Sequence, residues 1–213
     1  MFDFAPAFSR TPVAVPAALP DALPGGPVMA FDAGDEIYAE GDRSGALYQV
    51  TRGMVRIYRL LADGRRQICA FHTTGEIFGF ETGAERHFFA DAVTATGLRP
   101  LRPGSEADLS HELLKLALRS LNRAHDHLLT VGRNDAGGRV ATFLLEMAGR
   151  QSAGDRATVH LPMSRTDIAD YLGLTIETVS RVLTRFKDAR IIRLASAREV
   201  DLLDRAALEN MTA

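Results

Sequence analysis

Residues 164–187 read SRTDIADYLGLTIETVSRVLTRFK, and this stretch decides how the rest of the chain is interpreted. Ser164 is a good helix N-cap, and Asp167 follows in the first turn, where a negative charge suits the helix dipole. Gly173 can adopt a positive φ and so end that helix, and Thr175 can cap the next one. The stretch therefore predicts two helices joined by a tight turn.

The second predicted helix has two faces of different chemistry. Apolar residues recur at helical spacing and predict a buried stripe made of Val179, Leu183 and Phe186. Glu177, Ser180 and Arg181 stand at i, i+3 and i+4, so they share another face. Such a face can contact base edges in the DNA major groove, because Arg donates two hydrogen bonds to guanine and a carboxylate accepts one from cytosine. Ile176, at the N-terminal tip, can touch a thymine methyl group. An ordinary surface Glu–Arg pair has the same spacing, but the capped helix and the glycine turn before it favour DNA recognition.

The residues DIADYLGLTIETVSRVLTRF (167–186) resemble the helix-turn-helix of the CRP/FNR superfamily of bacterial transcription regulators. The pattern E-x-x-S-R, carried by Glu177, Ser180 and Arg181, resembles the FNR branch, whose members recognise TTGA half-sites. The cAMP-dependent branch carries an Arg where this chain has Ile176. Within the FNR branch, the segments YRLLADGRRQ (58–67), GEIFGFE (75–81) and LPMSRTDIADYLGLTIETVSR (161–181) are similar to the FixK-type regulators. The likeness runs from about residue 28 to the C-terminus.

This resemblance implies an α+β fold with an N-terminal β-roll similar to a cyclic-nucleotide-binding domain, a long dimerisation helix and a C-terminal winged helix-turn-helix. We expect a flexible leader rich in Pro and Ala over residues 1–27, where proline stands at positions 6, 12, 16, 20, 24 and 27. The β-roll is expected over 28–105, because short apolar alternations are broken there by Gly and Asp. The dimerisation helix is expected over 106–134 and the DNA-binding domain over 135–213.

Within these regions the sequence makes further predictions. Asp63-Gly64 separates two alternating runs and predicts a hairpin. In the long helix, spacings of three and four predict a seam for a second copy of the chain, made of Leu114, Ala117, Leu121, Ala124, Leu128 and Val131. A second stripe, made of Leu109, Leu113 and Leu116, is expected to pack on the roll. The paired glycines Gly137 and Gly138 weaken a helix and predict a hinge between the two halves. Helix 139–150 follows, then a short strand 159–161, and beyond the helix-turn-helix two strands, 191–194 and 199–203, form a wing.

The composition limits the class of protein. The chain has 213 residues, 46% of them hydrophobic, and a formal net charge of −2, unlike a small basic DNA-binding protein. Between His160 and Arg198, however, cations outnumber acids, as a DNA-contacting surface requires. Cys69 is the only cysteine, which excludes an internal disulfide and a cysteine-ligated zinc or iron–sulfur cluster. No apolar run is long enough to cross a bilayer, so we expect a cytoplasmic protein without a membrane partner.

The ligand of the β-roll is left open. In cAMP-binding relatives a Gly-Glu turn, an Arg-Ser pair and two hydroxyl residues of the long helix hold the nucleotide. Here Gly75-Glu76 and Arg86 are present, but His87 stands at the Ser position, and the hydroxyl pair falls near Ala124 and His125. We therefore expect no cofactor and no bound cAMP, with Arg86 as the residue that keeps the question open.

Three alternatives accompany the main interpretation. A small-molecule-gated regulator is one. A regulator gated by oxidation of Cys69 is another, although the apolar run around Cys69 favours a buried, inert thiol. A cupin-like metalloenzyme is the distant one. The closely spaced His125 and His127 lie on a predicted helix, where side chains two residues apart diverge, and we expect no metal and no catalytic residue.

The main interpretation is a homodimeric, sequence-specific transcription regulator, expected to be an activator, that binds double-stranded DNA at a palindrome of TTGA half-sites. Glu177, Ser180, Arg181 and Ile176 are the expected base-reading residues. Phosphate contacts are expected from Ser164, Arg165, Thr175 and Arg185. The resemblance implies control of low-oxygen respiration or nitrogen fixation by contact with RNA polymerase, for which Asp63, Gly64 and Arg65 at the hairpin tip are the candidates.

Overall fold

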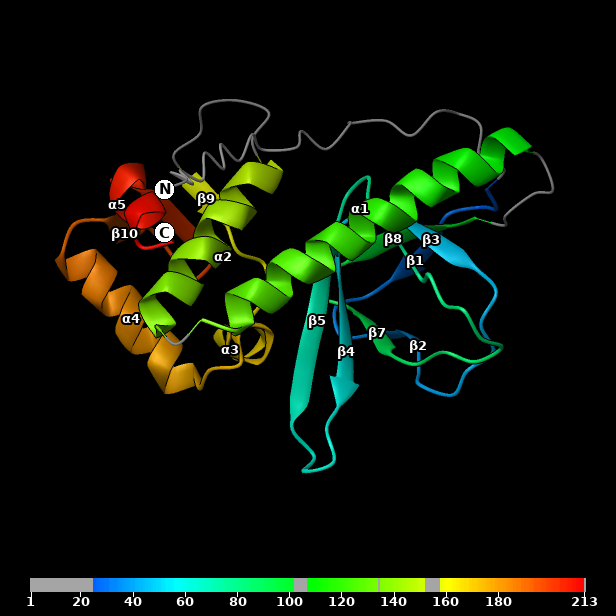
Figure 1. The fold of residues 1–213 in the computed structure, drawn as a ribbon, viewed down its shortest axis with the longest axis horizontal. Helices are drawn as coiled ribbons and strands as arrows, with labels where there is room; N and C mark the ends of the chain where they lie inside the picture. Colours follow the sequence, from blue (N-terminus) through cyan, green and yellow to red (C-terminus); the bar gives the residue numbers. More distant parts are fainter. Residues whose placement is uncertain (1–24, 102–106, 134, 152–157, 213) are drawn as a thin grey trace, which may run out of the picture.

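The computed structural model describes residues 25–101, 107–133, 135–151 and 158–212, and side chains from residue 113 onward in the long helix. The leader expected over residues 1–27 lies almost entirely outside the described residues. Figure 1 shows two lobes, a strand-rich N-terminal lobe and a mostly helical C-terminal lobe, with the long helix α1 (Ala107–Val131) lying across them.

The N-terminal lobe is the β-roll that the sequence predicts. One antiparallel four-stranded sheet has the order β1-β8-β3-β6, and the other has the order β2-β7-β4-β5. The strands are β1 (Met29–Phe31), β2 (Glu36–Tyr38), β3 (Leu47–Arg52), β4 (Met54–Leu60), β5 (Arg66–Thr73), β6 (Ile77–Phe78), β7 (Phe89–Ala92) and β8 (Thr96–Leu101). Alternate side chains of these strands fill the interior, as period-two patterning requires. The buried set includes Tyr38, Val50, Val55, Ile57, Phe78, Ala90 and Leu98.

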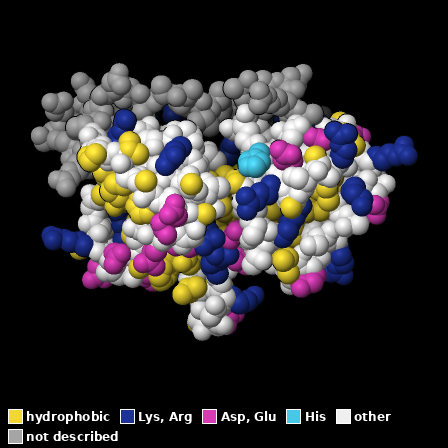
Figure 2. All heavy atoms as spheres, turned by 180° about the vertical axis from the view of Figure 1, so that it is seen from behind, with side chains coloured by type: hydrophobic (Ala, Val, Ile, Leu, Met, Phe, Trp, Pro, Cys, Tyr) yellow, Lys and Arg dark blue, Asp and Glu magenta, His cyan; other side chains and the backbone are white. Residues whose placement is uncertain are grey.

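The hairpin between β4 and β5 projects from the body of the molecule (Figures 1 and 2). Its strands pair from Met54 opposite Thr73 to Leu60 opposite Arg66. Gly64 has φ 79°, and its N–H donates to the carbonyl of Leu61, so the predicted Asp63-Gly64 turn is confirmed.

Helix α1 packs on the roll through one of its two predicted stripes. Leu113 and Leu116 contact a cluster of Leu47, Ile77 and Leu101, which confirms this stripe for two of its members. The side chain of Leu109 lies outside the described residues.

The C-terminal lobe contains the predicted elements and one more. Its elements are α2 (Ala136–Gln151), β9 (Thr158–His160), α3 (Arg165–Leu172), α4 (Ile176–Asp188), β10 (Ile192–Leu194), β11 (Glu199–Leu202) and α5 (Arg205–Asn210). The wing strands form an antiparallel sheet with the order β10-β11-β9. Helix α5 was not predicted. Met54, Ile68 and Phe71 of the roll join the core of this lobe, so a continuous apolar cluster connects the two lobes.

The paired glycines have a packing role. Both lie buried in the first turn of α2, where the Asp135 carboxylate accepts from the N–H of Gly138 at 2.6 Å. A Cβ on Gly137 would stand 2.5 Å from Nη2 of Arg185, and one on Gly138 would stand 2.9 Å from the carbonyl oxygen of Met211. Close approach of α4 and the C-terminal residues therefore accounts for both glycines, and the hinge stays a prediction.

Candidate nucleic-acid interface

The caps predicted for the helix-turn-helix are confirmed. The Ser164 hydroxyl accepts from the N–H of Asp167 at 3.0 Å, and the Asp167 carboxylate accepts in return from the N–H of Ser164 at 3.0 Å. This reciprocal capping box begins α3. Gly173, with φ 61° and ψ 39°, ends it, and the Thr175 hydroxyl accepts from the N–H of Thr178 to begin α4. These local bonds fix the angle at which the two helices meet.

Helix α4 buries one face and exposes the other. Its buried residues are Val179, Val182, Leu183 and Phe186, which include the whole predicted stripe. Ile176, Glu177, Ser180 and Arg181 are all exposed. Arg181 extends along the helix, with Nη2 at 3.4 Å from the Thr178 hydroxyl. The backbone N–H of Glu177 and the Thr175 hydroxyl hold the pKa of the Glu177 carboxyl below its ordinary value, with a further contribution from Arg181. The exposed face thus carries a guanidinium donor and an ionised carboxylate acceptor on adjacent turns.

The four candidate phosphate contacts differ in how far they are engaged within the chain. The hydroxyls of Ser164 and Thr175 serve as helix caps, and that of Ser164 also donates to Asp167 at 2.7 Å. Arg165 is half-buried; its Nη1 is buried without a hydrogen-bond partner, and burial lowers the pKa of its guanidinium. Arg185 is exposed and lies over the ring of Phe186, 5.8 Å from its centroid. Ser164, Thr175 and Arg185 are exposed and Arg165 is half-buried, and all four phosphate contacts stay predictions.

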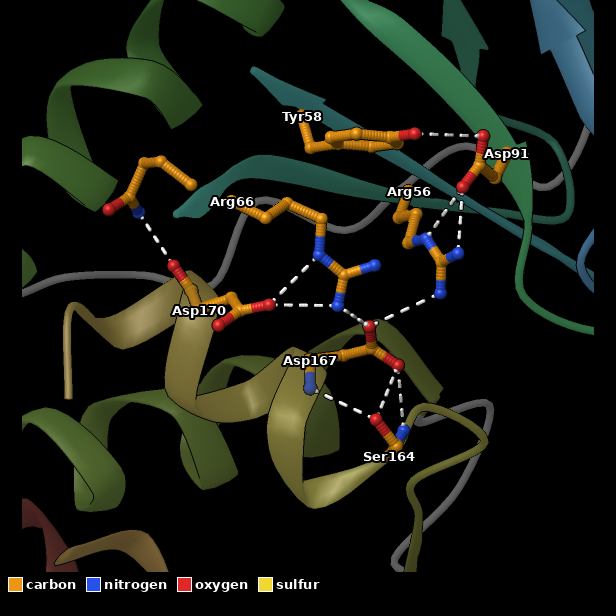
Figure 3. Close-up of polar contacts among 8 residues, drawn as sticks. Arg56, Tyr58, Arg66, Asp91, Ser164, Asp167 and Asp170 are labelled. Carbon is orange, nitrogen blue, oxygen red and sulfur yellow. Dashed lines mark hydrogen bonds and ion pairs between the residues drawn. The ribbon is translucent and has the colours of Figure 1, made fainter. Parts of the chain in front are cut away.

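Ion pairs connect α3 to the β4–β5 hairpin (Figure 3). Asp167 accepts from Nη1 of Arg56 at 3.2 Å and from Nη2 of Arg66 at 2.6 Å. Arg66 also binds Asp170, at 2.9 Å from Nε and 2.8 Å from Nη2. Burial alone would lower the pKa of Arg66, but Asp170 and Asp167 outweigh it and raise the pKa. Sequence reasoning missed this set of residues, because it considered Asp167 only as a helix-capping charge.

The same ion-pair set is anchored at its roll end. Arg56 donates to the Asp91 carboxylate on β7 from Nε at 3.1 Å and from Nη2 at 2.7 Å. On the hairpin, the Gln67 amide donates to the backbone carbonyl of Asp170 at 2.7 Å. Both strands of the hairpin therefore contribute polar contacts to the first helix of the helix-turn-helix.

A second junction joins α1, α2 and α3 around Tyr171. The ring of His127 stacks on Tyr171 with centroids 4.0 Å apart, and the Tyr171 hydroxyl donates to Glu146 at 3.3 Å. Burial lowers the pKa of His127 to about 4, so this imidazole is neutral at neutral pH. The C-terminal lobe is thus packed against the long helix α1 as well as against the roll.

Buried charges connect the roll to the helices. Glu76 accepts from Arg123 of α1 at 2.5 Å and lies 3.9 Å from Arg150 of α2. Burial would raise the pKa of Glu76, but Arg150, His72 and Arg123 outweigh it and lower the pKa. His72 lies beside Glu76, and its burial lowers its own pKa to about 3.

The groups around Arg86 do not fit a cyclic nucleotide. Arg86 is only 3% exposed, donates to the carbonyls of Gly79 at 2.8 Å and Ala46 at 2.6 Å, and lies 4.3 Å from the Tyr38 ring centroid. His87, at the expected Ser position, pairs with Glu81 at 2.9 Å. A phosphate would have to displace the two carbonyls from Nη1 and Nη2 of Arg86, whereas Nε is buried without a hydrogen-bond partner. Arg86 therefore holds two loops of the roll together through Nη1 and Nη2.

The remaining candidates are Cys69 and metal ligands. Cys69 is half-buried on β5, and burial raises the pKa of its thiol, with only partial opposition from Arg59. A raised pKa disfavours the reactive thiolate, which favours the inert interpretation. Within the described part of the chain, no cluster of three His, Cys, Asp or Glu side chains is arranged to hold a metal ion. None of the helices described there is long and apolar enough to cross a membrane.

The hairpin tip and the outer face of α1 are the two other predicted contact surfaces. At the tip, the Asp63 carboxylate binds Arg65 at 2.7 Å, and both side chains are exposed. On α1, Leu114, Leu121 and Leu128 are 56%, 50% and 68% exposed. Ala124 is exposed and Ala117 half-buried. Val131, at the end of the seam, lies close to the α3–α4 turn, where a Cβ on Gly173 would be 3.5 Å from its Cγ1.

Comparison with known proteins identifies the family. Residues 28–99 match the model of the cyclic nucleotide-binding domain, and residues 138–211 match that of the Crp-like helix-turn-helix domain. The nitrogen fixation regulation protein FixK of Rhizobium meliloti (strain 1021) is 50% identical over 184 residues, which cover 86% of each chain. FixK of Azorhizobium caulinodans is 42% identical over 213 residues, covering 95% of this chain and 84% of that one.

A solved structure gives the same result. The structure of FixK2 from Bradyrhizobium japonicum superposes with a TM-score of 0.83 at 40% identity, covering 90% of this chain and 98% of that one. The family consists of transcription regulators and not of enzymes, and its helix-turn-helix implies DNA binding. With the roll, the long helix and the winged helix-turn-helix arranged as described above, the chain belongs to the FixK-type regulators of the CRP/FNR superfamily.

Proposed function

We propose that this protein is a homodimeric activator that binds a palindrome of TTGA half-sites and acts in the cytoplasm. The observation that carries the proposal is the exposed face of α4, where Glu177, Ser180 and Arg181 lie together while the opposite face is buried. Arg181 would donate to O6 and N7 of the guanine, and Glu177 would accept from N4 of the paired cytosine. Ser180 would contact the neighbouring base, and Ile176 a thymine methyl group.

The proposed dimer forms through α1. Its exposed leucines are too many for a surface helix that has no partner, and they follow the spacing of a two-stranded coiled coil. A second copy of the chain would bury Leu114, Leu121 and Leu128 against their own equivalents. The two α4 helices would then enter successive major grooves about 34 Å apart on one side of the DNA.

The biological role follows from the relatives. Two of them carry the name nitrogen fixation regulation protein, so we infer control of genes for nitrogen fixation or low-oxygen respiration. Activation would require contact with RNA polymerase, for which the exposed hairpin tip at Asp63, Gly64 and Arg65 is the proposed surface.

The test is fluorescence anisotropy of the purified protein on a palindromic TTGA duplex and on a scrambled duplex at one salt concentration. Arg181→Ala should weaken specific binding by about 1 to 3 kcal/mol and reduce discrimination at the guanine. Arg185→Ala is the matched control; it should weaken binding to both duplexes alike and lower the slope of affinity against salt. Equal losses on both duplexes for Arg181→Ala would contradict the base-reading role.

The same assay separates the alternative modes of control. Selective binding without any additive supports a protein that binds DNA without an effector and whose activity is controlled by its cellular concentration. Selectivity that requires a nucleotide, another small molecule or a reductant would instead support a gated regulator, and a Cys69→Ser variant would show whether the thiol is the gate.

A further inference from the structure

Arg56 and Arg66 of the β4–β5 hairpin bind carboxylates of α3. These ion pairs join the two lobes and are not part of the internal packing of either one. Ser164 already caps α3, and Asp91 already pairs with Arg56. Asp170 lies in the last turn of α3, where its side chain has no capping role and reaches across to Arg66. The contact therefore acts between the lobes.

The hairpin belongs to the part of the molecule that carries α1. The roll packs on α1 through Leu113 and Leu116, and Arg123 of α1 pairs with the buried Glu76 of the roll. Strand β5 runs from His72 and Thr73, which lie beside Glu76, to Arg66, which contacts α3, and β4 pairs with it along this length. The contact of Arg66 with α3 and Arg123 on α1 are thus connected through β5 and Glu76.

Helix α3 in turn determines the direction of α4. The left-handed Gly173 and the cap at Thr175 join the two helices in one turn, and Ile168 and Leu172 of α3 share a core with Val179 and Leu183 of α4. A tilt of α3 against the hairpin therefore carries the exposed face of α4 with it. Arg66 and Asp170 are at the point where such a tilt would begin.

We propose that Arg66 and Asp170 form an interlobe latch that determines the spacing between half-sites which the dimer accepts. They are positioning residues, because they contact no base and act through α3. The inference rests on the proposed function, since it needs two recognition helices related by a dimer through α1. A latch of this kind affects the separation and rotation of the two α4 helices and leaves the contacts within each half-site unchanged.

The experiment is an anisotropy series on duplexes whose two TTGA half-sites differ in separation one base pair at a time. Each added base pair moves the second half-site by about 3.4 Å and rotates it by about 35°. The intact protein should bind the duplex with one spacer length about tenfold or more tightly than duplexes one base pair longer or shorter, which corresponds to a typical coupling free energy between two binding sites. In Asp170→Asn and in Arg66→Gln this preference should fall to about threefold or less.

Two matched variants sharpen the test. Arg65→Gln removes the neighbouring exposed guanidinium, which pairs with the equally exposed Asp63, and should keep the preference of the intact protein. Arg66→Lys keeps the charge, but a single ammonium cannot reproduce the contacts of Nε and Nη2 with both carboxylates, so its preference should be intermediate. Circular dichroism and size-exclusion chromatography check that each variant is folded and dimeric.

The outcomes are distinguishable. The latch is supported if affinity depends less on spacer length in the Arg66 and Asp170 variants, while the ratio of affinities for TTGA and scrambled half-sites stays unchanged. An unchanged profile, the same change in Arg65→Gln, or a parallel loss of half-site discrimination overturns it and leaves the proposed function intact. If the intact protein does not distinguish TTGA from scrambled DNA at any spacer, the proposed function fails and the latch inference fails with it.

Discussion

Replacing Asp167 by Asn tests how much the carboxylate at the start of α3 contributes to stability. One oxygen accepts from the N–H and hydroxyl of Ser164, and the other accepts from Arg56 and Arg66. Losing a capping interaction costs about 1 kcal/mol. Each charge-assisted hydrogen bond contributes about 1.5 to 3 kcal/mol, but solvent reaches the two arginines and each keeps another carboxylate partner. We therefore expect Asp167→Asn to lower the free energy of unfolding by about 3 kcal/mol.

Ser164→Ala is the control, because it removes the capping hydroxyl and leaves both arginines paired with Asp167. It should cost about 1 kcal/mol. Urea unfolding followed by circular dichroism measures both variants, and the difference between them reports the contribution of the two ion pairs. If Asp167→Asn costs within about 0.5 kcal/mol of Ser164→Ala, the ion pairs contribute nothing measurable and the reasoning is refuted.

Three further predictions concern packing, protonation and assembly. Gly138→Ala should lower Tm although Ala favours helix, because its Cβ would stand 2.9 Å from the Met211 carbonyl, whereas Gly149→Ala on the same helix meets nothing within 4 Å and should raise stability by up to about 1 kcal/mol. The pKa of His72 is about 3 in the folded protein and about 6.5 in the unfolded chain. As the pH falls below about 6.5, the unfolded chain therefore gains a proton that the folded protein does not bind. The free energy of unfolding should then decrease by up to about 1.4 kcal/mol for each pH unit. His72→Gln should flatten that slope in urea titrations between about pH 7 and 5; an unchanged slope would contradict the buried neutral imidazole. Leu121→Glu should yield monomers by sedimentation velocity, and a variant that stays dimeric would remove the seam on α1.

Local chemistry explains why much of the interface could be predicted from the sequence. Helix caps depend only on residues within about four positions of each other, so a short segment of sequence is enough to predict them. This holds for the N-caps at Ser164 and Thr175 and for the helix end at Gly173. The Asp63-Gly64 turn is of the same kind. The buried stripe of α4 follows from periodicity alone.

Contacts between distant residues could not be predicted in this way. Arg56 and Asp167 are separated by 111 positions, and Arg66 and Asp170 by 104, so no spacing rule connects them. The paired glycines show the opposite difficulty. Their weakness as helix formers was visible and predicted a hinge, but the atoms that require them, on Arg185 and Met211, come from elsewhere in the chain.

The two roles of Asp167 determine which variant can test the latch. The Asp167 carboxylate both caps α3 and binds the hairpin arginines. A loss of DNA binding in Asp167→Asn could therefore result either from unfolding of the first turn of α3 or from loss of the contact between α3 and the hairpin. The Asp170 carboxylate binds Arg66 from the last turn of α3, so its removal leaves the capping box at the other end of the helix in place. A change in spacer preference without a matching loss of α3 stability is therefore expected of Asp170→Asn, and it is this separation that distinguishes positioning of α4 from simple destabilisation of the helix that carries it.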